Sequence, residues 1–134
     1  MKTRRFLLLI LCLTIALPSD MFAQSSEVPA EILSALQAGD VSKLSGFLNN
    51  SVELVIANNN DVFSKQQASA IISDFFKSNK ISTFQVMHKQ NKDAASFAIC
   101  TLKTNNGSFR LYVLTRINNG QNLIQQLRIE PSND

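Results

Sequence analysis

The sequence predicts an α+β fold: three N-terminal helices packed on a strongly curved antiparallel sheet, in the order helix, helix, strand, helix and four-strand meander. Two observations predict this cone-like arrangement. Apolar residues recur mainly at helical spacing in the first half of the chain, and at every second position from Ile81 onwards. Asn-rich turn signals interrupt the second half at near-even spacing, which indicates successive hairpins.

The first 23 residues are predicted to be a secretory signal peptide rather than part of the fold. A basic start precedes an apolar run, Phe6 to Leu17, that is too short to cross a membrane as a helix. We expect cleavage after Ala23, an exported chain that is periplasmic or secreted, and one domain at 24–134 without a stable membrane span. An uncleaved anchor is the alternative, because Met21 stands where cleavage sites favour a small residue.

The charge and the scarcity of cysteine and histidine narrow the function classes. The leader holds three of the 13 basic residues and one of the 10 acidic ones, so the net charge falls from +3 to about +1. The remaining lysines are scattered, whereas nucleic-acid binding needs a concentrated basic face. Cys100 alone is left after cleavage and cannot form an intramolecular disulfide, and the single His88 excludes a multi-histidine metal site. We therefore expect no nucleic-acid partner, no metal and no cofactor.

Two short helices are predicted at the start of the domain. Pro29 suits the first turn of a helix over 29–38, and Gly39 suits the left-handed conformation that ends one. Asp40 can then cap a second helix, whose apolar side continues until Asn49. The two are expected to form a helical hairpin.

A strand and a longer helix follow this hairpin. Residues 51–57 alternate between apolar and polar, which predicts the first strand, and 58–61 form an Asn-rich turn. Ser64 and Gln67 have the spacing of a capping box, and the helix that they begin ends near Asn79. Its apolar stripe must lie on a sheet.

Four strands complete the domain at about 81–89, 94–103, 108–117 and 122–130. The last two turns between them contain Asn-Gly, which favours the turn types that join antiparallel strands. Strands of this length twist, so the sheet is expected to curl around its helices.

Alternation divides the meander into an inner face towards the helices and an outer face. The inner face is expected to carry Phe84, Val86, Phe97, Ile99, Phe109, Leu111, Val113, Ile117, Leu123, Leu127 and Ile129.

The middle of the outer face is too apolar to be left in water, and arginines surround it. Apolar side chains ringed by arginine are typical of a protein contact surface. We expect a homodimer or another protein contact there. The candidate interface residues are Met87, Leu102, Arg110, Tyr112, Leu114, Arg116 and Ile124.

This order of elements resembles the cone-shaped superfamily of nuclear transport factor two, SnoaL-type polyketide cyclases and ketosteroid isomerases. A closer similarity lies in the segments Leu36-Gln37-Ala38-Gly39-Asp40, Val52-Glu53-Leu54, Phe63-Ser64-Lys65-Gln66-Gln67-Ala68 and Phe75-Phe76. In these segments the chain is similar to a family of small exported bacterial domains of unknown function within that superfamily. The segments are caps and core positions, so the similarity implies the fold more than an activity.

The resemblance implies a pocket between the sheet and the helices, where isomerase members hold a buried carboxylate base. No acidic residue here is in phase with the inner face, so no catalytic residue is assigned. Four polar residues are in phase with it, and they are candidates to line a pocket for a small apolar or amphipathic ligand: His88, Thr101, Thr115 and Gln125.

Three hypotheses follow. The first is a non-enzymatic exported module that binds a small ligand or a protein partner. The second is an isomerase-like or cyclase-like enzyme that uses His88 with a carboxylate brought near by folding. The third is a structural dimerisation module.

Overall fold

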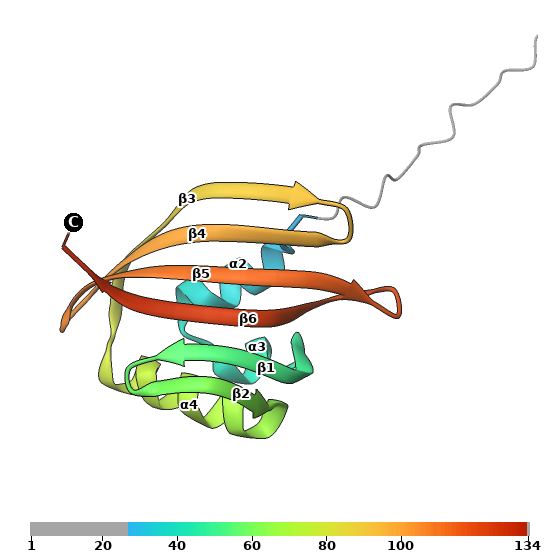
Figure 1. Cartoon of the computed structure of the whole chain (residues 1–134). Helices are drawn as coiled ribbons and strands as arrows, with labels where there is room; N and C mark the ends of the chain where they lie inside the picture. Colours follow the sequence, from blue (N-terminus) through green and yellow to red (C-terminus); the bar gives the residue numbers. More distant parts are fainter. Residues whose placement is uncertain (1–26, 134) are drawn as a thin grey trace, which may run out of the picture.

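The computed structural model describes residues 27–133, so the predicted leader and its cleavage site lie outside the described residues. Three helices and six strands make up the domain (Figure 1). In chain order they are α2 (Ala30–Ala38), α3 (Val41–Ser45), β1 (Leu48–Ile56), β2 (Asn59–Ser64), α4 (Lys65–Ser78), β3 (Ile81–Lys92), β4 (Ala95–Thr104), β5 (Gly107–Asn118) and β6 (Gln121–Ser132).

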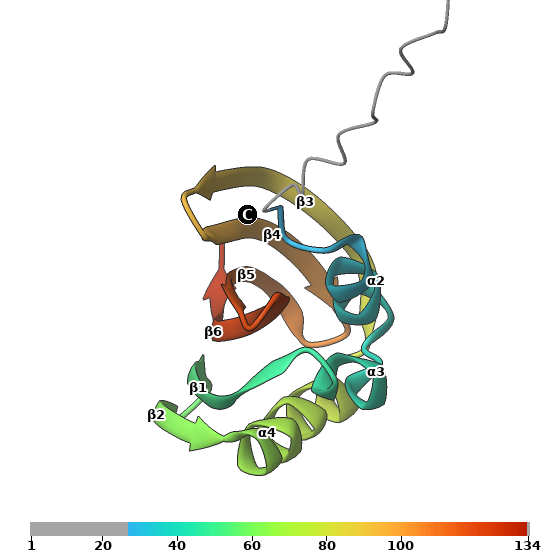
Figure 2. The same ribbon diagram turned by 90° about the vertical axis from the view of Figure 1, so that its right-hand side faces the viewer.

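The six strands form one curved sheet in the order β2-β1-β6-β5-β4-β3. β1 runs parallel to β6, and every other neighbouring pair is antiparallel. The sheet curls around the helices on one side and stays open, with β2 and β3 at its edges (Figure 2). The predicted α+β cone is therefore confirmed, with one parallel pair and one additional strand.

The structure contains the predicted end of α2 and the predicted caps at the starts of α3 and α4. Gly39 has φ 67°, the left-handed value expected after α2, and the Asp40 carboxylate accepts a hydrogen bond from the Lys43 amide at 3.0 Å. At α4 the Ser64 hydroxyl accepts from the Gln67 amide while the Gln67 side chain accepts from the Ser64 amide, which completes the capping box. Local chemistry thus places these helix ends.

The region between α3 and α4 differs from the prediction. The second helix ends at Ser45, and β1 begins at Leu48 rather than at residue 51. Residues 58–61 were predicted as a turn, but the chain turns tightly at Ala57, where φ is 55°, and then forms β2. β2 is a polar edge strand that pairs with β1, so its conformation depends on pairing rather than on its own sequence pattern.

The interior of the cone is filled with side chains. Phe75 of α4 makes edge-to-face contacts with Phe76 and with Phe109 of β5, at centroid distances of 5.4 and 5.1 Å. Helices and sheet thus share one core. Its fully buried large side chains are Ile32, Leu36, Leu44, Leu48, Val52, Leu54, Ile56, Ile72, Leu102, Leu111, Ile124 and Leu127.

The predicted faces of β4 were wrong. Ala98, Cys100 and Leu102 are fully buried against the helices, whereas Phe97 and Ile99 lie on the outer face. Both faces of this segment are apolar, so alternation alone cannot distinguish them. Pairing decides instead, because Ala98 and Cys100 lie opposite the buried Val113 and Leu111 of β5.

Two bulges change the faces of β3 and β6. On β3, Val86 pairs with Cys100 and His88 with Ile99, so the extra residue Met87 turns His88 to the outer face. On β6 the shift occurs at Gln125 and turns Ile124 into the core. The predictions of an inner His88 and an outer Ile124 were therefore wrong.

The same bulge in β6 also reverses Leu123, which was predicted on the inner face. Leu123 pairs with Arg116, an outer-face residue, whereas Leu127 and Ile129 beyond the bulge are buried as predicted. On β6, alternation therefore predicted the correct face only for the residues that follow the inserted Gln125.

Candidate functional site

The four residues predicted to line a pocket do not meet. His88 and Thr101 lie on the outer face, since they pair with Ile99 and Arg110. Thr115 is fully buried on the helix side, and Gln125 lies at the bulge in β6. These residues are divided between the two faces of the sheet and do not line a common cavity.

His88 is exposed at the edge of the sheet. Its ring centroid lies 5.9 Å from that of Phe97, a half-buried outer-face residue. The isomerase-type mechanism requires a base inside the cone, and His88 does not lie there.

Thr115 and Gln125 have structural partners. The Thr115 hydroxyl donates to the Ser96 carbonyl at 3.4 Å, and the Gln125 side-chain oxygen accepts from the Asn49 amide group at 3.3 Å. These bonds tie neighbouring strands together, which is the usual role of such residues in a sheet.

The cone interior contains no carboxyl group and no imidazole within residues 27–133. Its buried polar residues are Ser96 and Thr115, and no described Asp or Glu is buried. Nor do the described His, Cys, Asp and Glu residues gather into a group of three or more that could hold a metal ion. Within that part of the chain, the interior is a packed core.

Cys100 lies in this core and is fully buried. Burial raises the pKa of its thiol from 9.0 to about 11, because a thiolate would lose its hydration there. The thiol is therefore neutral at physiological pH, and a neutral buried thiol is a poor nucleophile.

The predicted interface residues fall into two groups. Arg110, Tyr112, Leu114 and Arg116 lie on the outer face of β5 as predicted, and Met87 is 57 % exposed at the β3 bulge. Leu102 and Ile124 are instead fully buried in the core and cannot belong to an outer surface. Leu102 and Ile124 are therefore removed from the set of candidate interface residues.

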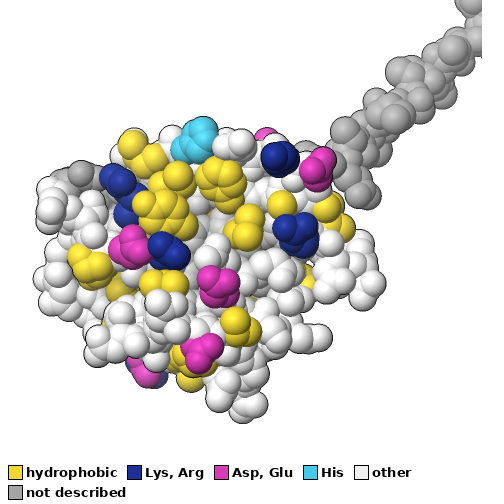
Figure 3. All heavy atoms as spheres, in the orientation of Figure 1, with side chains coloured by type: hydrophobic (Ala, Val, Ile, Leu, Met, Phe, Trp, Pro, Cys, Tyr) yellow, Lys and Arg dark blue, Asp and Glu magenta, His cyan; other side chains and the backbone are white. Residues whose placement is uncertain are grey.

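The same correction adds Phe97 and Ile99 to the surface. Together with Tyr112 and Leu114 they form what we call the apolar patch, at the centre of the exposed sheet face. Cross-strand pairing joins Phe97 to Leu114 and Ile99 to Tyr112, so the four side chains are contiguous. Figure 3 shows hydrophobic side chains gathered on this face between basic and acidic ones.

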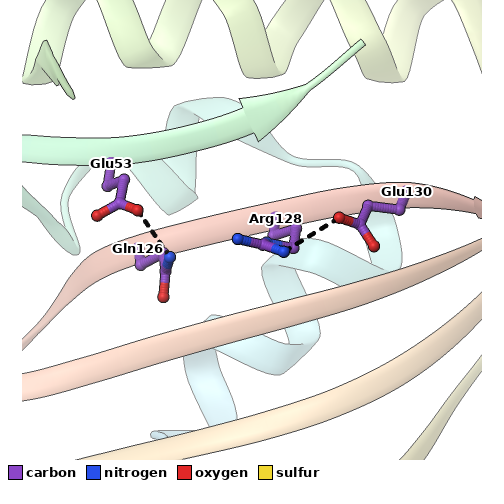
Figure 4. A network of polar contacts seen from close by, with 4 residues as sticks. All are labelled: Glu53, Gln126, Arg128 and Glu130. Atoms are coloured by element: carbon purple, nitrogen blue, oxygen red, sulfur yellow. Dashed lines mark hydrogen bonds and ion pairs between the residues drawn. The ribbon is translucent and has the colours of Figure 1, made fainter. Parts of the chain in front are cut away.

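A row of polar contacts borders the apolar patch along β1 and β6 (Figure 4). Gln126 donates to the Glu53 carboxylate at 2.9 Å, and Arg128 pairs with Glu130 at 3.2 Å. Both members of that ion pair have side chains 42 % exposed. The border of the patch therefore carries both signs of charge.

A separate hollow of about 510 Å³ lies where the chain enters α2. Val28, Pro29 and Ile117 contribute apolar atoms to its lining, and Asn122 contributes a polar side chain. The Asn122 amide nitrogen donates to the Glu27 carbonyl at 3.0 Å, whereas its buried side-chain oxygen has no partner among the described residues.

No helix in the described part of the chain is long and apolar enough to span a membrane. A curved, open sheet covered on one side by three helices is the architecture of the nuclear transport factor two-like class. An NTF2-like protein of unknown function from Cytophaga hutchinsonii has this fold, with a TM-score of 0.55 and 13 % identity over 75 % of this chain and 82 % of that one.

The chain belongs to the DUF4783 family, a domain of unknown function whose model matches residues 29–130. It is similar to DUF4783 family proteins of known structure from Bacteroides ovatus and Bacteroides fragilis, each 36 % identical to it. The first has a TM-score of 0.78 and aligns over 82 % of this chain and 100 % of its own; the second has a TM-score of 0.74, with 78 % and 99 %. Among curated proteins, none gives a significant sequence match.

Proposed function

We propose that this protein is an exported, non-enzymatic binding module that contacts another protein through the outer face of its sheet. The observation that carries the proposal is the apolar patch of Phe97, Ile99, Tyr112 and Leu114, which no other element of the described domain covers. Monomeric proteins rarely expose contiguous apolar patches larger than a few hundred Å² unless the surface is used for contact.

The composition of this face supports a protein partner. Aromatic residues and arginine are enriched in protein interfaces, and a polar rim usually surrounds an apolar centre. Here Phe97 and Tyr112 lie near the centre, while Arg116, Arg128 and Glu53 lie around it. An enzymatic role lacks comparable support, since the packed interior has no acidic group among the described residues.

Photo-crosslinking in the exporting cell tests the proposal. Tyr112 is replaced by photoreactive benzoylphenylalanine, which is also a large aromatic side chain, and the protein is irradiated in place. We expect a protein adduct at this position. The matched control places the same residue at Ala70, an exposed position of α4 on the helical layer. Adducts at neither position, or equally at both, would contradict the proposal.

The hollow beside α2 supports a second candidate function, the binding of a small amphipathic ligand. Its volume of about 510 Å³ suits a small molecule, and the unpartnered Asn122 oxygen could accept a hydrogen bond. Native mass spectrometry of protein purified from its exporting host should then show a bound mass that Asn122→Leu removes. Purified protein without bound mass would argue against this candidate.

A further inference from the structure

We infer that the open edge of β3 binds an extended, acidic segment of the partner protein, which pairs with β3 and becomes the seventh strand of the six-stranded sheet. This inference rests on the proposed function and names the part of the partner that is recognised. Addition of a strand to a sheet edge is a common mode of protein recognition. Main-chain hydrogen bonds supply its affinity, and alternate side chains supply its specificity.

β3 is the longer of the two edge strands of the sheet. It has 12 residues, whereas β2 has six. The sheet order places β4 on one side of β3 and no described strand on the other, and β3 is the outermost strand in Figure 1. An edge strand presents main-chain donors and acceptors along its open side, so another strand can pair with it.

The C-terminal part of β3 is exposed on both of its faces. Every residue from 85 to 92 is exposed. Val86 is 36 % exposed although it lies on the helix side, opposite the buried Cys100, and Met87 is 57 % exposed. In the neighbouring β4, by contrast, alternate residues are buried. The helices therefore leave this part of β3 uncovered, and an added strand would shield its apolar side chains.

The charge of β3 selects the kind of strand that can be added. β3 carries Lys89 and Lys92, and it contains no Asp or Glu between Ile81 and Lys92. Lysine at a sheet edge opposes pairing with a second copy of the same strand, because like charges would lie opposite each other. A strand with aspartate or glutamate places opposite charges there instead. An acidic segment therefore fits this edge, and a second β3 does not.

The bulge at Met87 determines where the added strand begins. The extra residue bends β3 and interrupts its ladder with β4, and regular pairing then continues from His88 to Lys92. We therefore expect the partner segment to pair over 88–92, which contains both lysines. Since these lysines are three positions apart, one lies on each face of the sheet. The partner segment should carry a matching pair of acidic residues three positions apart.

This stretch of β3 is continuous with the apolar patch. The ring centroid of His88 lies 5.9 Å from that of Phe97, and His88 pairs with Ile99. A strand added to β3 extends the outer face beyond His88, so the rest of the partner can cover the patch. Edge and patch then form one binding surface.

The first test places photoreactive benzoylphenylalanine at position 88 in the exporting cell and identifies the crosslinked peptide by mass spectrometry. His88 is exposed, so this replacement leaves the core intact. We expect a peptide from another protein that contains the predicted pair of acidic residues. A peptide without acidic residues, including β3 of a second copy, would overturn the inference.

The second test measures the affinity of a synthetic copy of that peptide for the processed chain, residues 24–134, which contains the whole core. Lys89→Glu combined with Lys92→Glu should raise the dissociation constant about tenfold or more. Lys65→Glu combined with Lys77→Glu makes the same charge change at exposed positions of α4 and should leave it unchanged. Circular dichroism confirms that the variants are folded. Equal affinities of the two variants would contradict the role of the β3 lysines.

The third test uses only the wild-type chain and two further peptides, with methyl groups on either the odd or the even amide nitrogens. Methylation removes main-chain donors while the side chains and their charges stay the same. In a strand added to β3, only one of these two sets of amides faces β3. One methylated peptide should therefore lose binding and the other keep it. Equal binding of both would overturn strand addition.

The crosslink at position 112 separates failure of this inference from failure of the proposed function. An adduct at 112 with none at 88 keeps the contact through the outer face and rejects strand addition. An adduct with an acidic peptide at 88 and none at 112 supports strand addition and rejects the contact through the apolar patch. Adducts at neither position reject both.

Discussion

At the scale of single residues, burial controls the chemistry of Cys100. The folded-state pKa of about 11 exceeds the ordinary value of 9.0, so the unfolded chain loses the thiol proton first as the pH rises. The stability that this group contributes is fully present below pH 9 and is lost as the pH approaches 11.

We predict that the free energy of unfolding falls by roughly 2 kcal/mol more between pH 8 and pH 11 in the wild type than in Cys100→Ala. Urea denaturation of the processed chain at both pH values measures the difference. Other groups that titrate in this range are present in both proteins, so their contributions to the free energy of unfolding cancel in the comparison. Parallel pH profiles would show that the thiol is not desolvated.

Single polar residues also stabilise the turns. The Asn105 side chain accepts a hydrogen bond from the Lys80 amide at 2.8 Å, and the Asn106 side chain donates to the Ser78 carbonyl. The turn between β4 and β5 therefore holds the end of α4. The asparagines were predicted as turn residues, but their partners lie 25 and 28 positions away and become visible only in the folded chain.

At the scale of the elements, the bulge at Met87 determines which side chains the edge strand presents. Val86 pairs with Cys100 and His88 with the next residue, Ile99, so Met87 is additional to the ladder. Removing it leaves every other pair in register.

Deletion of Met87 should therefore change the free energy of unfolding by less than about 1 kcal/mol and leave His88 on the outer face. Deletion of Thr101 from β4, whose pairing with β5 has no register shift, should cost more than about 3 kcal/mol, because one half of that strand must then reverse its faces. Chemical denaturation of both variants checks the difference. Equal losses of stability would contradict the assignment of Met87 as the bulge.

Helices and hairpins were largely predictable because their signals are local. The left-handed Gly39, the Asp40 cap and the capping box of Ser64 with Gln67 act within a few residues and lie where they were predicted. β2 was not predictable, since its polar sequence has no alternating pattern and becomes a strand only beside β1.

At the scale of the whole molecule, the start of the fold lies close to the predicted cleavage site. Val28 is already a core residue, and the Glu27 carbonyl accepts a hydrogen bond from Asn122. Cleavage after Ala23 would leave a short linker before the domain.

Expression of the full chain in an exporting bacterium should therefore yield a protein whose intact mass, measured by mass spectrometry, corresponds to a chain that begins at Gln24. Replacement of the residue before the cut, Ala23→Lys, should block processing and leave the chain in the membrane fraction, because signal peptidases require a small side chain there. An unprocessed wild-type chain recovered from membranes would favour the uncleaved anchor.

The candidate surface was predictable in part. Arg110, Tyr112, Leu114 and Arg116 follow a regular alternation along β5, and they lie on the outer face as predicted. The rest of the surface and the predicted pocket depended on β3, β4 and β6. These strands are bulged or apolar on both faces, so their pattern in the sequence does not determine their orientation.

The sequence by itself determined the α+β class, the order of the elements other than β2, and the helix caps and hairpin turns of the meander, because each of these follows from residues close together along the chain. Only the tertiary structure decided that β1 lies parallel to β6, that side chains fill the interior of the cone, and that Phe97 and Ile99 rather than Leu102 and Ile124 face outwards. The physical reason is register. The face that a side chain occupies depends on the strand with which it pairs, and one inserted residue reverses that face without altering the pattern on either side.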